Sequence, residues 1–268
     1  MKSQGRDVDT WASGDAYENN VGRWSRRVAP RLLEWLEAPP DNVWLDVGCG
    51  AGALSQTILR QTAPRELTCL DRSAGFIGHV RAHVDDPRVR FTVGDAQALP
   101  VESSTYDAVV SGLMLNFVPR PQQAVNDMAR VTLPGGRVAV YVWDYADKMQ
   151  LMRYFWDAAA ALDPAAGALD EGRRFSICHP PALRDLFQQA GLRDVTVQAI
   201  DIATHFRDFD DFWLPLLGGQ GPAAGYAVSL PEERRAALRD RLRATLPFAP
   251  DGSIPLMARA WAARGLKT

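Results

Sequence analysis

The stretch Val43-Trp44-Leu45-Asp46-Val47-Gly48-Cys49-Gly50-Ala51-Gly52-Ala53-Leu54 decides the fold. It joins a short apolar run to a carboxylate, then to three alternating glycines, and then to a helical pattern. An apolar run of this length predicts a buried parallel strand. The glycines permit positive φ and let a ligand lie against the backbone, and the helix that follows directs free N–H groups toward that ligand. The stretch therefore predicts a nucleoside-cofactor site between a strand and a helix.

Asp46 indicates the charge of that ligand. The spacing Gly48-x-Gly50-x-x-Ala53 also satisfies the dinucleotide pattern. However, a carboxylate at the end of the strand would repel a diphosphate by roughly 4 kcal/mol per charge pair at about 4 Å and an effective dielectric near 20. It would favour S-adenosylmethionine (SAM), which carries a sulfonium and an α-ammonium, and whose carboxylate the helix N-terminus can serve. We therefore expect SAM rather than NAD, and an NAD-dependent oxidoreductase is the alternative.

Strand and helix patterns alternate along the chain. The predicted strands of the first half cover 42–47, 66–71, 89–94, 106–111 and 136–143, with helices near 52–62, 74–84 and 121–132. Such alternation predicts an α/β fold with parallel strands joined by right-handed crossovers. Beyond Tyr145 we expect helices near 149–162 and 180–190, a strand near 194–201, an excursion over 207–250 and a last strand near 256–264. In the excursion, Ser229-Leu230-Pro231-Glu232 matches a capping box that would introduce a helix.

Length and composition predict one soluble domain. The 268 residues fit a single domain made of a helical cap (1–40), a cofactor-binding core (41–145) and a C-terminal part (146–268) that includes a lid insertion (207–250). The net charge of −2 offers no attraction to nucleic acid or to an acidic membrane. Met1 to Thr10 lacks a secretory signal, and the three cysteines have no metal spacing. We expect a cytoplasmic monomer or homodimer without metal.

Several motifs resemble those of one family. Leu45 to Gly52 resembles the first motif of class I SAM-dependent methyltransferases, and Cys69-Leu70-Asp71, Val93 to Pro100, Tyr106 to Ser111 and Leu133 to Arg137 resemble the motifs that follow it. The likeness covers roughly residues 41–144, and the N-terminal segment resembles small-molecule members related to ubiquinone and menaquinone methyltransferases. The resemblance implies a Rossmann-like, seven-stranded, mostly parallel sheet in the order 3-2-1-4-5-7-6. Its last strand would be antiparallel and helices would cover both faces.

Ligands of an open parallel sheet bind beyond the carboxyl ends of its strands, which gathers the predicted cofactor residues in one cleft. The resemblance assigns the loop from Asp46 to the methionine part of SAM, Asp71 to the ribose hydroxyls and Asp95 with the Ala96 N–H to adenine. The full expected set is Tyr17, Arg23, Asp46, Gly48, Cys49, Gly50, Gly52, Asp71, Arg72, Asp95, Ala96, Ser111, Gly112 and Leu113.

Some of these residues have simpler interpretations. Arg23 could pair with the methionine carboxylate while Tyr17 closes over it, but Arg23 could equally lie on the solvent face of its helix. Asp71 could instead cap the helix that begins near Ser73, and Asp95 could be a turn former.

A sulfonium methyl group is already activated, so the protein must mainly align an acceptor in line and exclude water. A general base is needed only if the acceptor must lose a proton, and the candidates are His179, His205 and Asp144. The expected activity is transfer of a methyl group to an O, N or C atom of a small, apolar or aromatic acceptor. A SAM-binding protein without turnover, or one that uses SAM in another role, is a second alternative.

Overall fold

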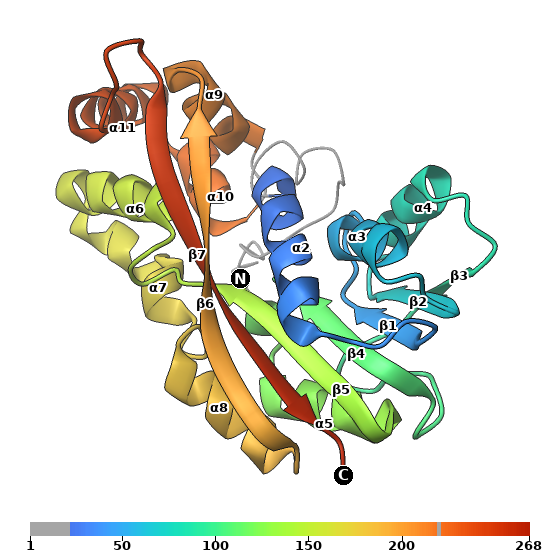
Figure 1. Cartoon of the computed structure of the whole chain (residues 1–268). Coiled ribbons are helices and arrows are strands. Elements are labelled where there is room, and N and C mark those ends of the chain that lie inside the picture. The colour runs from blue at the N-terminus through green and yellow to red at the C-terminus, as the bar shows by residue number, and fades with distance from the viewer. Residues whose placement is uncertain (1–21, 219–220) are drawn as a thin grey trace, which may run out of the picture.

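The computed structural model describes residues 22–218 and 221–268, which form one seven-stranded sheet in the order β3-β2-β1-β4-β5-β7-β6 (Figure 1). The predicted strand order is confirmed. The first five strands pair in parallel, and β7 runs antiparallel to both β5 and β6. The strands are β1 (Val43–Val47), β2 (Glu66–Asp71), β3 (Val89–Val93), β4 (Tyr106–Gly112), β5 (Thr132–Trp143), β6 (Arg193–Phe206) and β7 (Ile254–Leu266).

Helices cover both faces of the sheet. Helices α2 and α3 contact one another, and α2 also contacts β5, β6 and β7, whereas α5 contacts β4 and β5 and packs against α8. The helices are α2 (Arg23–Leu36), α3 (Ala53–Gln61), α4 (Ala74–His83), α5 (Pro121–Val131), α6 (Gln150–Leu162), α7 (Glu171–Arg174), α8 (Pro180–Gln189), α9 (Phe209–Trp213), α10 (Pro222–Ser229) and α11 (Glu232–Thr245), with single turns η2 (Leu115–Phe117), η3 (Pro164–Ala168) and η4 (Leu214–Gly218).

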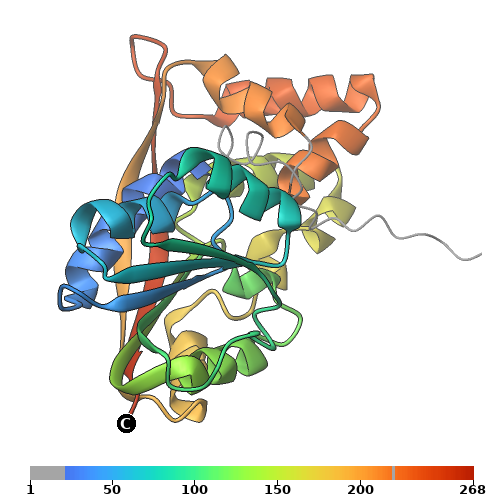
Figure 2. The same cartoon turned by 90° about the vertical axis from the view of Figure 1, so that its right-hand side faces the viewer.

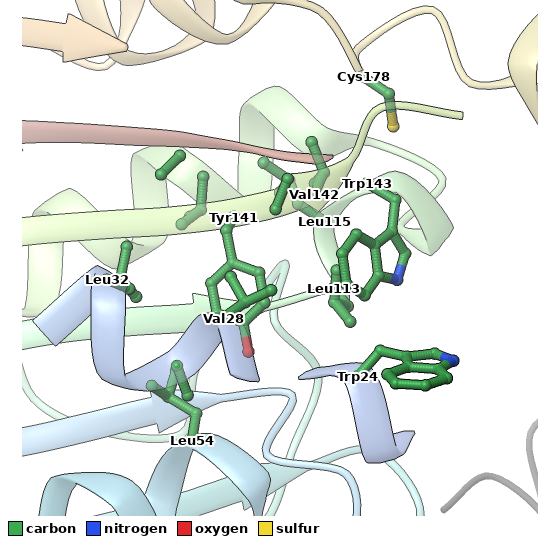
Figure 3. Close-up of a cluster of buried hydrophobic side chains, with 14 of the residues drawn as sticks. Trp24, Val28, Leu32, Leu54, Leu113, Leu115, Tyr141, Val142, Trp143 and Cys178 are labelled. Atoms are coloured by element: carbon green, nitrogen blue, oxygen red, sulfur yellow. The ribbon is translucent and has the colours of Figure 1, made fainter. Parts of the chain in front are cut away.

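A buried apolar layer holds α2 against the sheet. Val28 and Leu32 of α2 are fully buried, and they face Tyr141 of β5 and Leu54 of α3 in the cluster shown in Figure 3. These positions recur at helical spacing along α2, so burying one face of the helix stabilises its position across β5. The packing brings the N-terminal end of α2 toward the carboxyl end of β5.

The lid, which we define as α9, η4, α10 and α11, lies at one end of the molecule in both views (Figures 1 and 2). Because β6 is antiparallel to β7, and β7 to β5, β6 points the same way as the parallel strands and delivers α9 at their carboxyl ends. Leu238 and Leu242 of α11 are buried, so the apolar stripe of the arginine-rich helix packs inward.

The last strands are longer than the sequence predicts. Strand β6 runs from Arg193 to Phe206 and pairs with β7 as far as Phe206↔Ile254, well beyond the predicted end near residue 201. Along its second half, buried and exposed residues alternate, which is the pattern of a strand with one face packed. The hairpin therefore continues past the rest of the sheet and supports the lid.

The predicted capping box is wrong. Helix α10 extends to Ser229, whose Oγ donates a hydrogen bond to the carbonyl oxygen of Tyr226 at 2.8 Å. Helix α11 begins only at Glu232, with Pro231 as its N-cap and no side-chain cap. Ser229 is the last residue of α10, two residues before the N-cap of α11, so it does not occupy the position from which a capping box would begin α11.

Candidate cofactor site

A cavity of about 730 Å³ opens at the carboxyl ends of β1, β2, β3 and β4. Its size lies within the usual range of small-molecule sites, roughly 300 to 1,000 Å³. It is lined by Ser25, Asp46, Gly48, Cys49, Gly50, Ala51, Ala53, Leu54, Leu70, Asp71, Arg72, Ser73, Gly75, Phe76, Gly94, Asp95, Ala96, Gln97, Gly112, Leu113, Met114, Phe117, Val118, Pro119 and Tyr141. Most of the residues predicted to bind the cofactor are thus brought together around one space.

The glycine loop shapes one wall of this cavity. Gly48 has φ of +72°, and a Cβ there would lie 2.4 Å from Cγ of Met114, so a side chain at this position would clash. A Cβ at Gly50, where φ is +52°, would meet no atom within 4 Å. Hydrogen bonds to β2 hold the loop in place, because the backbone N–H groups of Gly48 and Cys49 both donate to the carbonyl oxygen of Leu70. Gly50 therefore leaves bare backbone facing the cavity.

Asp46 is a buried carboxyl with one unsatisfied oxygen. Its Oδ2 accepts a hydrogen bond from Ser55 Oγ at 2.5 Å, while Oδ1 has no partner among the described residues. The pKa of Asp46 is raised to about 7; burial is the main cause, the bond from Ser55 opposes the rise and the nearby Asp71 adds to it. A buried carboxylate of this kind is stabilised by a cation.

Asp71 ends β2 and offers both of its oxygens at the edge of the cavity. Oδ1 accepts a hydrogen bond from the Ser73 backbone N at 2.8 Å, and Oδ2 accepts one from the Gly50 backbone N at 3.0 Å. Burial raises the pKa of Asp71 despite these bonds. Because each carboxylate oxygen can accept more than one hydrogen bond, Asp71 can still receive two hydroxyl groups. Ser73 itself provides the N-cap of α4.

Asp95 and Gln97 form a hydrogen-bonded turn after β3. The Gln97 backbone N donates to Asp95 Oδ1 at 2.8 Å, and this bond is the main cause that lowers the pKa of Asp95. Gln97 Oε1 accepts a hydrogen bond from the Arg120 backbone N at 3.1 Å. The carboxylate therefore stays ionised, and the turn is linked to the segment before α5.

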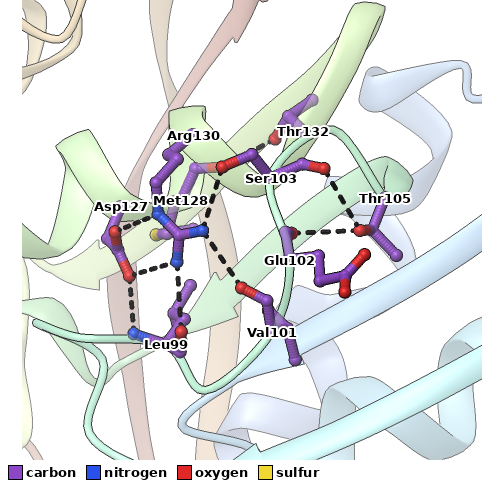
Figure 4. Close-up of polar contacts among 9 residues, drawn as sticks. All are labelled: Leu99, Val101, Glu102, Ser103, Thr105, Asp127, Met128, Arg130 and Thr132. Carbon is purple, nitrogen blue, oxygen red and sulfur yellow. Dashed lines mark hydrogen bonds and ion pairs between the residues drawn. The ribbon is translucent and has the colours of Figure 1, made fainter.

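Arg130 of α5 anchors the loop that follows this turn (Figure 4). Its guanidinium donates to the carbonyl oxygens of Leu99 and Val101 at 3.1 and 3.0 Å, and it pairs with Asp127. Asp127 in turn accepts a hydrogen bond from the Leu99 backbone N at 2.5 Å. The ion pair thus fixes both the N–H and the C=O of Leu99, which holds the preceding turn against the cavity.

The Arg130→Ala variant should lower the free energy of unfolding by about 1 to 2 kcal/mol, because carbonyl groups of the loop lose their donors. Urea denaturation measures the change. Arg90, whose side chain is 60% exposed and lies 4.0 Å from Glu66, provides the control, since Arg90→Ala removes an exposed ion pair and one exposed hydrogen bond to the Pro87 carbonyl oxygen. Equal effects of the two substitutions would contradict the anchoring role.

Ser25 and Tyr141 line the cavity although the sequence did not identify them. Ser25 Oγ and the Tyr141 hydroxyl lie 2.9 Å apart, and both residues are buried. A Cβ at Gly112 would lie 2.5 Å from this hydroxyl oxygen, so the absence of a side chain at Gly112 makes room for Tyr141. The hydroxyl pair forms a polar wall at the end of the cavity near Leu113.

Several predicted cofactor residues lie elsewhere. Arg23 forms an ion pair with Asp211 of α9 at 3.0 Å and stacks on the Trp24 ring, so its guanidinium ties α2 to the lid rather than facing the cavity. Gly52 is the N-cap of α3, with φ of +85°, and is outside the lining. Ser111 is buried in β4 just below Gly112 and also lies outside the lining. Tyr17 lies outside the described residues.

The three candidate bases also lie outside the cavity lining. His179 caps α8, where its Nδ1 accepts a hydrogen bond from the Ala182 backbone N at 3.4 Å. His205 is exposed on β6, opposite Pro255 of β7. Asp144 follows β5 and is buried, which raises its pKa. The sequence around each of these residues did not predict these positions.

Two further observations concern residues 22–218 and 221–268. Within these ranges, no cluster of three or more His, Cys, Asp or Glu side chains could hold a metal ion. None of the helices described there is both long enough and apolar enough to span a membrane.

Comparison with known proteins shows what the chain is similar to. Residues 45–140 match the family model described as a methyltransferase domain. The chain is 34% identical over 113 residues to the ubiquinone/menaquinone biosynthesis C-methyltransferase UbiE of Cereibacter sphaeroides, an alignment that covers 41% of this chain and 45% of that protein. It therefore spans less than half the length of this relative.

Two other likenesses extend further along the chain. The 2-phytyl-1,4-naphtoquinone methyltransferase of Thermosynechococcus vestitus is 28% identical over 174 residues, covering 61% of this chain and 77% of the relative. The solved structure of Haemonchus contortus phosphoethanolamine N-methyltransferase 2, in complex with phosphomonomethylethanolamine and S-adenosylhomocysteine, has a TM-score of 0.60 and 15% identity and covers 95% of this chain and 56% of that one. The structural likeness shows the shared fold. The chain is thus similar over residues 45–140 to the methyltransferase domain, and over part of its length to UbiE and to the naphtoquinone methyltransferase.

Proposed function

We propose that the protein binds SAM in the cavity and transfers its methyl group to a small-molecule acceptor. The observation that carries this proposal is the buried Asp46 carboxyl, which belongs to the cavity lining and whose Oδ1 lacks a partner among the described residues. A ligand with a cationic group stabilises the ionised carboxylate, whereas the diphosphate of NAD would place negative charge near it.

The other lining residues fit the remaining parts of SAM. Gly50 leaves backbone exposed for close approach, Asp71 can accept both ribose hydroxyls, and Asp95 with the Ala96 N–H can receive the adenine edge. Arg72 and Phe76 also line the cavity and would flank the adenine. When bound, SAM supplies an activated methyl group on a sulfonium centre.

The protein's own contribution is to orient the two reactants and to exclude water. Leu113 and Met114 close the cavity after β4, and the Ser25 and Tyr141 hydroxyls bound it from α2 and β5. The acceptor is expected to approach from the side of the lid, which covers the carboxyl ends of the strands. The methyl group goes to an O, N or C atom of the acceptor, and the enzyme is expected in the cytoplasm as a monomer or homodimer.

Calorimetric titration with SAM, S-adenosylhomocysteine and NADH tests the cofactor assignment. We expect the first two to bind and NADH not to bind, and the reverse result would support an oxidoreductase. A screen of candidate metabolites with methyl-labelled SAM, followed by mass spectrometry, then tests methyl transfer. Tight cofactor binding without any labelled product across the screen would favour a SAM-binding protein that does not transfer methyl groups.

The Asp71→Ala variant should bind SAM about 1 to 3 kcal/mol more weakly, since hydrogen bonds to a charged group are lost. Isothermal titration calorimetry measures the affinity. Asp86→Ala serves as the control, because Asp86 pairs with Arg88 at 2.7 Å and lies outside the lining. Unchanged affinity in Asp71→Ala would refute the assigned role of Asp71.

A further inference from the structure

The carboxylate on the methionine part of the proposed cofactor needs hydrogen-bond donors. Arg23, which the sequence suggests for this role, pairs with Asp211 at 3.0 Å and lies outside the cavity lining. An ionised group that is enclosed by protein without partners is unfavourable, and hydrogen bonds to a charged group are the stronger kind. The donors must therefore come from residues that do line the cavity.

The acidic side chains of the lining lie toward one end of the cavity. They are Asp46, Asp71 and Asp95, at or just after the carboxyl ends of β1, β2 and β3, which are consecutive strands of the sheet. The lining residues from β4 and β5, Gly112 and Tyr141, are uncharged. Because like charges repel, a ligand carboxylate is most stable away from the three acids. The end of the cavity at β4 and β5 therefore suits it best.

Two hydroxyl groups meet at this end. Tyr141 points from β5 toward α2 (Figure 3), and its hydroxyl oxygen lies 2.9 Å from Ser25 Oγ. A Cβ at Gly112, another lining residue, would lie 2.5 Å from the same hydroxyl oxygen, so it is the hydroxyl end of the ring that reaches the cavity wall. Both Ser25 and Tyr141 are buried, so bulk water competes little with a ligand for these groups.

The pair can donate a hydrogen bond to a ligand. Each hydroxyl group carries one hydrogen, and either oxygen can be the donor in the contact between Ser25 and Tyr141. Only one of the two hydrogens can lie between the two oxygens, so the other is directed away from the contact. A carboxylate oxygen is the best acceptor for this hydrogen, whereas the ammonium group of the same ligand has a better partner in Asp46.

The first turn of α3 faces the same space. Ala53 and Leu54, the first two residues of α3, line the cavity, and α3 packs against α2, the helix that carries Ser25. A helix N-terminus has unpaired N–H groups and a partial positive charge, which favour a carboxylate nearby. The helix therefore adds to the attraction that the two hydroxyl groups provide.

We propose that Ser25 and Tyr141 bind the methionine carboxylate of the cofactor. One hydroxyl donates to a carboxylate oxygen, while the acids at the other end of the cavity attract the cationic groups and the ribose hydroxyls. Holding the cofactor at both ends fixes the direction of its sulfonium centre relative to the acceptor. The inference rests on the proposed function, because it adds two binding residues to the same cofactor site.

A second buried hydroxyl pair in the same sheet provides a matched control. The Tyr106 hydroxyl of β4 donates to Thr68 Oγ1 of β2 at 3.3 Å, and both residues are buried. Both lie outside the cavity lining. Tyr106→Phe therefore removes the same chemical group as Tyr141→Phe from the interior of the protein but leaves the cavity unchanged.

The test compares two ligands by isothermal titration calorimetry on the full chain. One is S-adenosylhomocysteine, and the other is its decarboxylated analogue, which keeps the ammonium group but lacks the carboxylate. Wild type should bind S-adenosylhomocysteine at least about 10-fold more tightly than the analogue. Ser25→Ala and Tyr141→Phe should each reduce this preference severalfold by weakening only the binding of S-adenosylhomocysteine, while Tyr106→Phe should keep it.

The affinity for the analogue distinguishes the possible failures. It should stay unchanged in Ser25→Ala and Tyr141→Phe, which also shows that the variants are folded; if one variant does not fold, the other decides. The inference is overturned if wild type binds both ligands equally, if the preference survives both substitutions, or if they weaken both ligands to the same extent. Failure of wild type to bind S-adenosylhomocysteine would instead overturn the proposed function, and this inference with it.

Discussion

The Asp46→Asn variant is expected to bind SAM roughly 10- to 100-fold more weakly than wild type at pH 7, since a charge-assisted hydrogen bond in a buried site is lost. The side chain keeps its shape and can still accept a hydrogen bond from Ser55, so the change isolates the charge. Asp46 is fully buried, and little water can compensate for the missing negative charge.

In wild type the affinity should also depend on pH. The pKa of Asp46 is about 7 without ligand, so below pH 7 the carboxyl is mostly protonated. A bound cation favours the ionised form and lowers this pKa, so SAM binding releases a proton below pH 7 and the affinity rises with pH up to about that value. One proton per ligand predicts affinity about 50-fold weaker at pH 5 than at pH 7.

Isothermal titration between pH 5 and pH 7, in buffers of different ionisation enthalpy, measures both the affinity and the released proton. Asp71 faces the same cavity with a raised pKa, and Cys49 stays a neutral thiol because burial and contact with Cys69 raise its pKa well above the ordinary value. The pH dependence should therefore shrink greatly in Asp46→Asn. It should persist in Asp107→Asn, because Asp107 lies outside the cavity lining, where it accepts a hydrogen bond from the Val43 backbone N at 2.8 Å and pairs with Arg65 at 3.9 Å. A full pH dependence in Asp46→Asn would assign it to another group.

Local patterns were sufficient to predict the part of the site that lies on strand ends. Asp46, Asp71 and Asp95 each follow a short apolar run, and parallel strands bring their carboxyl ends to one edge of the sheet. The three carboxylates line one cavity, as predicted. Strand order was also predictable, because it follows from the family resemblance rather than from any single element.

Contacts between distant segments could not be predicted in the same way. The Ser25 and Tyr141 hydroxyls meet only because α2 packs across β5, which joins residues 116 positions apart. Arg23 is paired with Asp211, 188 positions away, and nothing in the local sequence of α2 indicates that acid. The predicted lengths of β6 and β7 were too short for a related reason, because each strand is extended by pairing with the other.

A buried carboxyl outside the cofactor cavity should control the pH dependence of stability. Glu171 of α7 is 2% exposed, and its Oε2 accepts a hydrogen bond from the indole Nε1 of Trp156. The pKa of Glu171 is raised to about 7, mainly by burial; the bond from Trp156 and the charge of Arg153 oppose the rise, and Asp170 adds to it. Arg153 is itself paired with Asp170, so its charge is largely neutralised there.

Because the folded-state pKa lies above the ordinary value of 4.5, the folded protein prefers the protonated form. This contribution to stability is fully present below about pH 4.5 and is lost as the pH rises to about 7. A rise of this size corresponds to about 3 kcal/mol. Glu171→Gln stays neutral and still accepts the Trp156 hydrogen bond, so it should unfold with a free energy about 3 kcal/mol larger than that of wild type at pH 8.

Urea denaturation of wild type and Glu171→Gln between pH 5 and pH 8 measures this difference. The difference in free energy of unfolding between the two proteins should be small at pH 5 and should increase toward pH 8, where wild type carries a buried negative charge. Glu232→Gln provides the control, because Glu232 is 74% exposed and pairs with Arg235 on the surface of α11. A constant gap across the pH range would show that Glu171 does not titrate there, and the buried Trp156 contact alone would then account for its place in the core.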